Sequence, residues 1–494
     1  MNGLAENISS MDLTISSSQS MQLDLPPSCV EFCPAHPSYF LVGTYNLQKE
    51  ENGDNDEGDA GGPKSKEDDN EEPGEAEEAA GKRSQTRTGS IMVFQLLNGK
   101  ARRIQTISQP SAVFDLHFAP QTDRGDICAA VSSTGTITLL RLSPGQPSST
   151  STETETAVLQ PLSPSGLKIQ NSDENALLTY FAWHPTIPGL MAVTTNTGKV
   201  QFVRIDEDYQ TATALGSPAI EHGAELCRGY QSLDDSERPV IEEPMEAWFV
   251  AFSGLWEEST QSNEPLLLST VFSGGDDSSL RLRSYRLAGI DESDTNKASD
   301  DDSEEGFNEE SAEDLDDGPV RYHYAGKAIT GHNAGVTAIL PLPFTMSEGS
   351  QVVLTGSYDD HLRVWAITPP HKNYGRPKTR LLAEENLGGG VWRLKVIEEL
   401  SSMSGTGPWT AVVLASCMHA GARVIRIRGG ADLGQELEIE VLAKFEEHKS
   451  MNYGSDYSRV EGTLARDGVK SEVVCVSTSF YDRLLCVWKF DAPV

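Results

Sequence analysis

Seven segments of similar character recur along the chain, each a run of about five to seven residues that is apolar or alternates between apolar and polar. A polar or glycine-containing turn precedes each run. The runs are TGSIMVFQL from Thr88, STGTITLLRL from Ser133, NTGKVQFVRI from Asn196, DDSSLRLRSYRL from Asp276, YDDHLRVWAI from Tyr358, HAGARVIRI from His419 and YDRLLCVWKF from Tyr481. This pattern is typical of half-buried β-strands. It predicts seven equivalent strands.

Two further apolar runs lie upstream of most of these strands. The nearer ones include DICAAVS, GLMAVTT, LLLSTVFSGG, QVVLTGS, AVVLAS and EVVCVST, and the farther ones include CVEFCP, VFDLHFAP, LTYFAWHP, WFVAFS, GVTAILPLP, VWRLKV and NYGSDYS. Units of three clear strands and a weaker fourth bury their faces only against their neighbours, so they stack into a ring. The clearest unit has the WD-type pattern, with Gly331-His332, a turn at Asp359 and a terminal Trp365. The sequence predicts an all-β, seven-bladed WD-repeat β-propeller without long helices.

The ends of the chain bear on how such a ring closes. Only four residues follow Phe490, too few for a fourth strand in the last blade. We expect Met21–Leu25 or Met11–Ser16 to supply that strand, because closure removes an exposed sheet edge. The predicted organisation has two parts. Residues 1–20 form an N-terminal segment that is a candidate for the ring-closing strand, and residues 21–490 form a single propeller.

Charge is distributed unevenly along the chain. The 494 residues hold 74 acidic and 39 basic side chains, a net charge of −35. Residues 50–80 and 291–317 each contain 14 acids and at most two Lys, and together they account for 25 of these excess charges. Both are predicted to be disordered acidic loops, and residues 144–156 a Ser/Thr-rich loop. Direct binding to nucleic acid or to an anionic membrane is not expected from so acidic a chain.

The compartment is predicted from the N-terminus and the cysteines. The first 20 residues have no basic and apolar signal regions, and no run is long enough to span a bilayer. The seven Cys are scattered, without paired zinc-site spacing. We expect a monomeric protein of the cytoplasm, or also the nucleus, that needs no metal or other cofactor.

One turn position is in register in all seven units and indicates a candidate site. It holds Thr88, Thr134, Thr197, Asp277, Asp359, His419 and Asp482. An Asp or Thr there often only holds its own turn, and this simpler interpretation applies least to His419. The last four blades carry the titratable groups, and on the same face the predicted loops bring residues 246–248, 389–393 and 452–456. In the alternative interpretation Trp248 and Trp392 are core residues.

Common catalytic signatures are absent. No GxSxG, HExxH, GxxxxGK[ST] or GxGxxG occurs. By pattern alone, a protein-binding propeller is the default.

Several segments on these blades nevertheless resemble one specific family, the WD-repeat diphthine methyl ester esterases of diphthamide biosynthesis. They are SCVEFCP (28–34), VGTY (42–45), EAWFVAF (246–252), SGGDDSSLR (273–281), TGSYDDHLRVW (355–365), GGVWRLK (389–395), ASCMHAG (415–421), NYGSDYS (452–458) and TSFYDRLLCVW (478–488). Arg283 stands where a blade-closing Trp is expected, and the second and third blades match only as generic strands. The resemblance implies a carboxylic ester hydrolase that demethylates diphthine methyl ester on translation elongation factor 2 before amidation.

The resemblance also gives the candidate residues a chemistry. The modified side chain carries a trimethylammonium group beside the ester, and aromatic faces with nearby carboxylates bind such cations. The expected substrate-binding residues are Glu246, Trp248, Asp276, Tyr358, Gly389, Gly390, Trp392, Arg393, Tyr453 and Tyr481, with Asp456 a further source of charge.

The proposed general base is His419, oriented by Asp359 or Asp456. A covalent route through Cys417 or Ser416 is the alternative, and the backbone of Gly388–Gly390 is a candidate oxyanion hole. The competing function is a non-catalytic adaptor that presents the elongation factor to the other diphthamide enzymes. An adaptor of a ubiquitin ligase or of chromatin would need a partner motif that the sequence does not show.

Overall fold

The structure is a computed structural model of the chain. It describes residues 13–49, 85–144, 158–163, 166–223, 245–254, 256–258, 266–287, 320–322, 324, 326–401, 407–432, 434–435, 437–459 and 471–492. The predicted acidic loops at 50–80 and 291–317 lie outside the described residues, as does the Ser/Thr-rich loop apart from Pro144.

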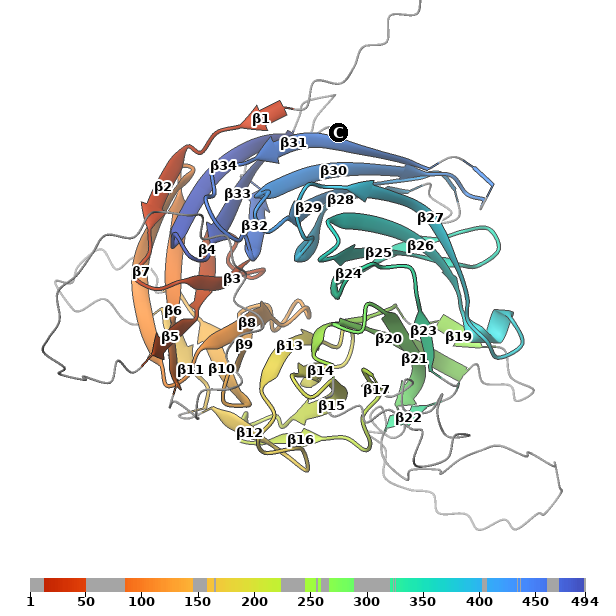
Figure 1. The fold of residues 1–494 in the computed structure, drawn as a ribbon. Coiled ribbons are helices and arrows are strands. Elements are labelled where there is room, and N and C mark those ends of the chain that lie inside the picture. The colour runs from red at the N-terminus through yellow and green to blue at the C-terminus, as the bar shows by residue number, and fades with distance from the viewer. Residues whose placement is uncertain are drawn as a thin grey trace, which may run out of the picture.

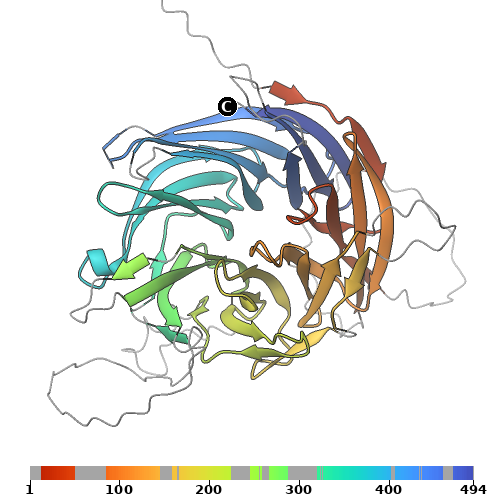
Figure 2. The same cartoon turned by 180° about the vertical axis from the view of Figure 1, so that it is seen from behind.

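The described strands form seven blades around a centre (Figures 1 and 2). The innermost strands are β3 (Pro27–Phe32), β8 (Val113–Phe118), β13 (Leu178–Trp183), β18 (Ala247–Phe252), β24 (Val336–Thr345), β28 (Arg393–Ser401) and β32 (Gly454–Arg459). The second strands are β4 (Tyr39–Thr44), β9 (Ile127–Ser132), β14 (Leu190–Thr195), β20 (Leu266–Gly275), β25 (Gln351–Ser357), β29 (Trp409–Ser416) and β33 (Ser471–Ser479). The fold is the predicted all-β propeller.

The third strands carry the repeat from which the fold was predicted. They are β6 (Gln85–Leu97), β10 (Thr136–Leu142), β15 (Lys199–Ile205), β21 (Leu280–Leu287), β26 (His361–Thr368), β30 (Ala422–Gly429) and β34 (Leu484–Ala492). The outer strands are β7 (Lys100–Gln109), β11 (Leu159–Pro161) with β12 (Leu167–Gln170), β16 (Ala212–Ala214) with β17 (Ile220–Glu221), β22 (Val320–Tyr322) with β23 (Lys327–Ile329), β27 (Lys378–Asn386), β31 (Glu438–Phe445) and β2 (Gln19–Gln22). Short strands β5 (Asn46–Lys49) and β19 (Trp256–Glu258) extend the first and fourth blades. The helical element of the described residues is the 3-10 turn η1 (Pro370–Lys372), and no helix there is long and apolar enough to cross a membrane.

The N-terminal segment contributes to two blades. Strand β2 pairs antiparallel with β34 and completes the seventh blade, with Met21 opposite Leu485. Strand β1 (Leu13–Ile15) instead adds in parallel to β31 of the sixth blade. The ring is therefore closed by a strand that overlaps the Met21–Leu25 candidate, while the Met11–Ser16 candidate contributes to the neighbouring blade.

Side chains that link strands within a blade follow the WD-type pattern. In the fifth blade Thr355 Oγ1 contacts His332 Nε2 at 2.8 Å and accepts a hydrogen bond from Trp365 Nε1 at 2.9 Å. In the fourth blade His222 bridges Ser273 and Asp277, and Arg283 takes the place of the tryptophan, with its guanidinium 3.9 Å from the centre of the Tyr322 ring.

Candidate functional site

Four of the predicted aromatic side chains meet on one face of the ring, around Trp392. The centre of the Trp392 ring lies 5.9 Å from that of Trp248, 5.7 Å from Tyr358 and 4.9 Å from Tyr453. These residues come from the starts of innermost strands in three blades and, for Tyr358, from the turn after β25. The structure thus brings together the aromatic group expected from the sequence.

A bulge in the innermost strand turns Trp248 toward this group. The pairing of β18 with β20 shifts register between Ala247 and Phe249, so Trp248 is the extra residue. A bulge re-aims a side chain in this way without interrupting the rest of the ladder. Strand β8 has the equivalent shift between Val113 and Asp115, where Phe114 is the extra residue.

The aromatic group continues into the seventh, first and second blades. The ring of Phe480 lies 5.6 Å from Tyr453, 5.1 Å from Tyr481 and 6.0 Å from Tyr45, and Tyr45 is 5.5 Å from Phe114. The sequence prediction missed Tyr45, Phe114 and Phe480. We call the whole set the aromatic belt: Tyr45, Phe114, Trp248, Tyr358, Trp392, Tyr453, Phe480 and Tyr481.

Two carboxylates, Glu246 and Asp276, lie beside the belt and form no close ion pair with a residue that the structure describes. The indole Nε1 of Trp248 donates a hydrogen bond of 2.7 Å to Oδ1 of Asp276. Burial raises the pKa of Asp276 and of Glu246, and the charge of Asp276 raises the pKa of Glu246 further. The charge of Arg87 lowers the pKa of Glu246 and that of His222 lowers the pKa of Asp276, but burial and the neighbouring carboxylates outweigh them. A bound cation would relieve this unfavourable pairing of like charges.

Asp359 occupies the turn before β26 and holds its own blade. Its carboxylate pairs with Arg363 at 2.8 Å and accepts a hydrogen bond from the backbone N–H of Asn333 at 2.8 Å. Burial alone would raise its pKa, but these donors lower the pKa to about 2. Among the described residues, no contact between Asp359 and His419 is found. The geometry therefore favours the interpretation that Asp359 only holds its own turn.

Asp456 lies inside the ring rather than on the belt. Its side chain is 1% exposed, and Oδ1 pairs with Lys395 Nζ at 2.6 Å. Oδ2 accepts a hydrogen bond of 2.7 Å from the backbone N–H of Phe32. Burial raises the pKa of Asp456, and Lys395 opposes that rise. The structure does not bring Asp456 to His419.

His419 and Cys417 lie in the turn between β29 and β30. His419 is exposed to solvent, as a base that takes a proton from water requires. Cys417 is buried, and burial raises the pKa of its thiol to about 12, which keeps it protonated and a poor nucleophile. The two side chains therefore differ in access to solvent, although both were expected on one face.

The glycines at 388–390 pack against this same turn. A Cβ at Gly389 would lie 2.4 Å from the carbonyl oxygen of Cys417, and a Cβ at Gly390 would lie 2.5 Å from the sulfur of Met418. The backbone N–H of Gly388 donates to the Asn386 side chain at 2.9 Å. Close packing therefore accounts for Gly389 and Gly390, and a φ of 85° accounts for Gly388.

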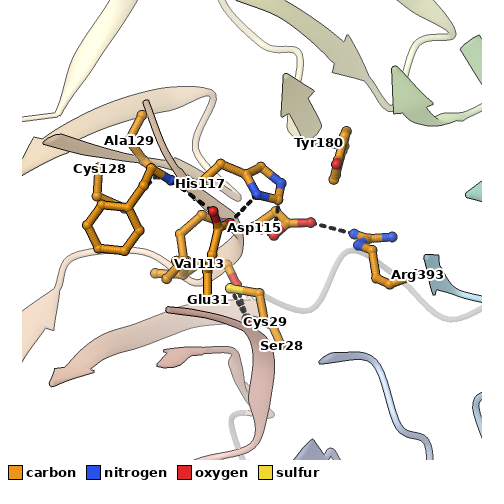
Figure 3. Close-up of polar contacts among 12 residues, drawn as sticks. Ser28, Cys29, Glu31, Val113, Asp115, His117, Cys128, Ala129, Tyr180 and Arg393 are labelled. Carbon is orange, nitrogen blue, oxygen red and sulfur yellow. Dashed lines mark hydrogen bonds and ion pairs between the residues drawn. The ribbon is translucent and has the colours of Figure 1, made fainter. Parts of the chain in front are cut away.

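A charged cluster that the sequence prediction missed lies on the innermost strands (Figure 3). Arg393, expected to bind substrate, reaches Asp115 of the second blade with Nη2 2.5 Å from Oδ2. His117 Nδ1 lies 2.5 Å from Glu31 of the first blade, and its Nε2 lies 3.6 Å from Asp115. The available signal was charge at alternate positions of predicted inner strands, in VEF, FDLHF and WRLK. Among the described residues, no three His, Cys, Asp or Glu side chains are placed to ligate a metal ion.

Comparisons with known proteins identify relatives over part of the chain. A protein of Schizosaccharomyces pombe named diphthine methyltransferase is 33% identical over 163 residues, which cover 33% of this chain and 39% of that protein. Over this stretch the chain is similar to that diphthine methyltransferase. A Dictyostelium discoideum protein named diphthine methyltransferase homolog is 25% identical over 28% of this chain and 31% of its own length. These two similarities confirm the predicted family resemblance. In each case the matched region spans less than half the length of the relative.

Two other comparisons complete these findings. No family model matches the chain. The crystal structure of Sqt1 from Saccharomyces cerevisiae aligns with 97% of this chain and 100% of its own, with a TM-score of 0.46 and 11% identity.

Proposed function

We propose that this protein hydrolyses the methyl ester of diphthine methyl ester on translation elongation factor 2, the step of diphthamide biosynthesis that precedes amidation. The relationship to the diphthine methyltransferases supports a role in that pathway. The structural observation that carries the proposal is the aromatic group around Trp392 with the carboxylates of Glu246 and Asp276 beside it. The proposed location is the cytoplasm, where translation takes place.

The proposed substrate carries a quaternary ammonium group, which cannot donate a hydrogen bond. Such a cation is attracted to the faces of Trp and Tyr rings and to carboxylates nearby. Trp248 and Asp276 are joined by a hydrogen bond, so both features are held in one place. We therefore assign cation binding to this end of the belt.

The breadth of the belt suits a folded protein substrate. Aromatic side chains from six blades lie on one face, and Tyr481 is 63% exposed. Exposed Tyr and Trp residues are common anchors of protein interfaces. We propose that the elongation factor docks over this face with its modified side chain directed toward Trp392.

The proposed general base is His419, which would accept a proton from the attacking water. Asp359 and Asp456 are each engaged by a basic side chain elsewhere, so neither is proposed to orient it. Hydrolysis then adds water across the ester, releasing methanol and leaving a carboxylate.

The test uses purified protein and elongation factor that carries the methylated side chain. Release of methanol, with loss of one methylene mass from the modified peptide, is the expected result. No release at micromolar enzyme contradicts hydrolysis, and a gain of mass in the presence of a methyl donor would instead match the name of the relatives. His419→Ala should remove turnover while the protein stays folded, and unchanged turnover excludes His419 as the base.

A second candidate function is a non-catalytic adaptor, favoured by the breadth of the exposed belt. It predicts tight binding of the elongation factor without methanol release. Tyr481→Ala should weaken binding in either case, whereas Tyr374→Ala should not, because Tyr374 is fully exposed beside η1 and away from the belt. Binding without turnover under all conditions selects the adaptor.

A further inference from the structure

Six charged or titratable side chains lie together on the innermost strands of the first, second, sixth and seventh blades. We call them the inner cluster: Glu31, Asp115, His117, Arg393, Lys395 and Asp456. The side chains of Lys395 and His117 are 41% and 24% exposed, so water reaches the cluster. The proposed reaction gives none of its members a role, although the sequence analysis expected Arg393 and Asp456 at the site.

Arg393 connects this cluster to the aromatic belt. Its guanidinium carbon lies 5.0 Å from the centre of the Trp392 ring and 4.7 Å from that of Tyr180. Nη1 donates to the carbonyl oxygens of Trp392 and Thr337, and Nη2 donates to Asp115. A guanidinium has five N–H donors, so two have no partner among the described residues. These two remain for a ligand.

The charges of the inner cluster do not oppose anion binding by Arg393 while His117 is protonated. Three carboxylates face Arg393, Lys395 and His117, so the cluster is neutral when His117 is protonated. Burial lowers the pKa of His117, but the charges of Asp115 and Glu31 outweigh it and raise the pKa above the ordinary value. Asp115 is then shared between His117 and Arg393, and it does not cancel the charge of Arg393 alone.

Trp392 therefore lies near groups of opposite charge. The Arg393 guanidinium carbon is 5.0 Å from the centre of its ring, and the ring of Trp248, which is hydrogen-bonded to Asp276, is 5.9 Å away. The charges of Arg393, Asp276 and Glu246 all act on Tyr358, whose ring is 5.7 Å from that of Trp392. Burial and the charges of Tyr453, Asp276 and Glu246 raise its pKa, and Arg393 opposes that rise. Small ligands that carry a cation next to a carboxyl group match this arrangement.

We propose that Arg393 is the carboxyl-binding residue of the site, and that it recognises the carboxyl group adjacent to the quaternary ammonium. Asp115 is its positioning residue, since it holds the guanidinium from across the ring. The inference rests on the proposed function for the identity of the natural ligand, but the binding of a small cationic carboxylate can be measured without it. A carboxylate should bind better than the neutral ester, because both partners then carry charge.

The test compares three small probes by calorimetry: glycine betaine, its methyl ester and choline. All carry a trimethylammonium group, and only glycine betaine carries a carboxylate. The wild type should bind glycine betaine roughly tenfold more tightly than choline, a ratio typical of one charge-assisted hydrogen bond. Arg393→Gln should abolish this preference and leave choline binding in place, whereas Asp276→Asn should weaken both probes alike.

Equal binding of glycine betaine and choline by the wild type, or an unchanged preference in folded Arg393→Gln, overturns the inference. Arg393→Lys keeps the charge without the planar fork and should retain part of the preference. If neither variant folds, the wild-type preference must fall as the pH rises through the titration of His117, and a constant preference overturns the inference. His117 is faced by Glu31 of β3, Asp115 of β8, Arg393 of β28 and the ring of Tyr180 of β13.

Asp115→Asn separates a positioning role from a structural one. Removal of this charge should lower the pKa of His117 and move the pH dependence of the glycine betaine preference to lower pH. A merely structural role would change the stability without moving that profile. Methanol release is measured separately. A binding preference that depends on Arg393, without methanol release, contradicts the esterase function and supports this inference. Methanol release without such a preference supports the esterase function and contradicts this inference.

Discussion

The indole Nε1 of Trp248 donates a hydrogen bond of 2.7 Å to Oδ1 of Asp276, and this bond stabilises the ionised carboxylate beside the aromatic belt. Burial already raises the Asp276 pKa, so Trp248→Phe, which removes the donor, should raise it further. Binding of choline requires the ionised form and should be lost at a higher pH in the variant. Choline titrations between about pH 4 and 7 measure the shift.

A matched control separates this effect from a general loss of tryptophan. Trp365→Phe removes an indole donor to Thr355 within the fifth blade, away from the carboxylates. It should lower stability and leave the pH dependence of choline binding where it is in the wild type. If choline binding is lost at the same pH in Trp248→Phe and in the wild type, the hydrogen bond does not set the pKa of Asp276.

Asp359 should behave as a structural residue. Its folded-state pKa of about 2 is below the ordinary value of 3.8, so the ionised pair with Arg363 contributes stability above about pH 4 and loses it as the pH falls toward 2. Asp359→Asn should cost about 1–2 kcal/mol in the free energy of unfolding at neutral pH, with a difference that shrinks in acid. Urea unfolding at several pH values measures this. Turnover per folded molecule should be unchanged, and its loss at unchanged stability would return Asp359 to the mechanism.

Ring closure can be tested with two leucines of the N-terminal segment. Leu23 is 4% exposed and packs in the core between the seventh and first blades, whereas Leu13 in β1 is 56% exposed. Leu23→Ala should lower the free energy of unfolding by about 2–4 kcal/mol, and Leu13→Ala by less than about 0.5 kcal/mol. Urea unfolding of both variants gives the comparison. Similar losses would mean that β1 carries as much of the closure as the segment that follows it.

Features that repeat locally in the sequence predicted the fold and part of the site. The turn register identified the third strands, and the motifs around Trp248, Trp392 and Tyr453 placed three rings on one face. Contacts between remote strands were not predictable: Asp115 and Arg393 are 278 residues apart and in blades that are not neighbours. A bulge in β8 brings Phe114 into the belt, and the alternation of apolar and polar residues does not reveal a bulge. Asp456 was expected near His419, but it pairs with Lys395 of the neighbouring blade, which is again a contact between remote segments.

The last prediction concerns Cys417, the candidate nucleophile of the covalent route. Its thiol is buried and its pKa is raised to about 12, so the thiolate that attacks an ester is scarce at neutral pH. Cys417→Ala should therefore retain turnover, with at most a modest loss of stability, because the side chain packs in the core between the fifth and sixth blades. Iodoacetamide should label Cys417 only after unfolding, as peptide mass spectrometry can show. A folded Cys417→Ala protein without turnover, together with labelling of the native thiol, would replace His419-activated water by a covalent intermediate on sulfur.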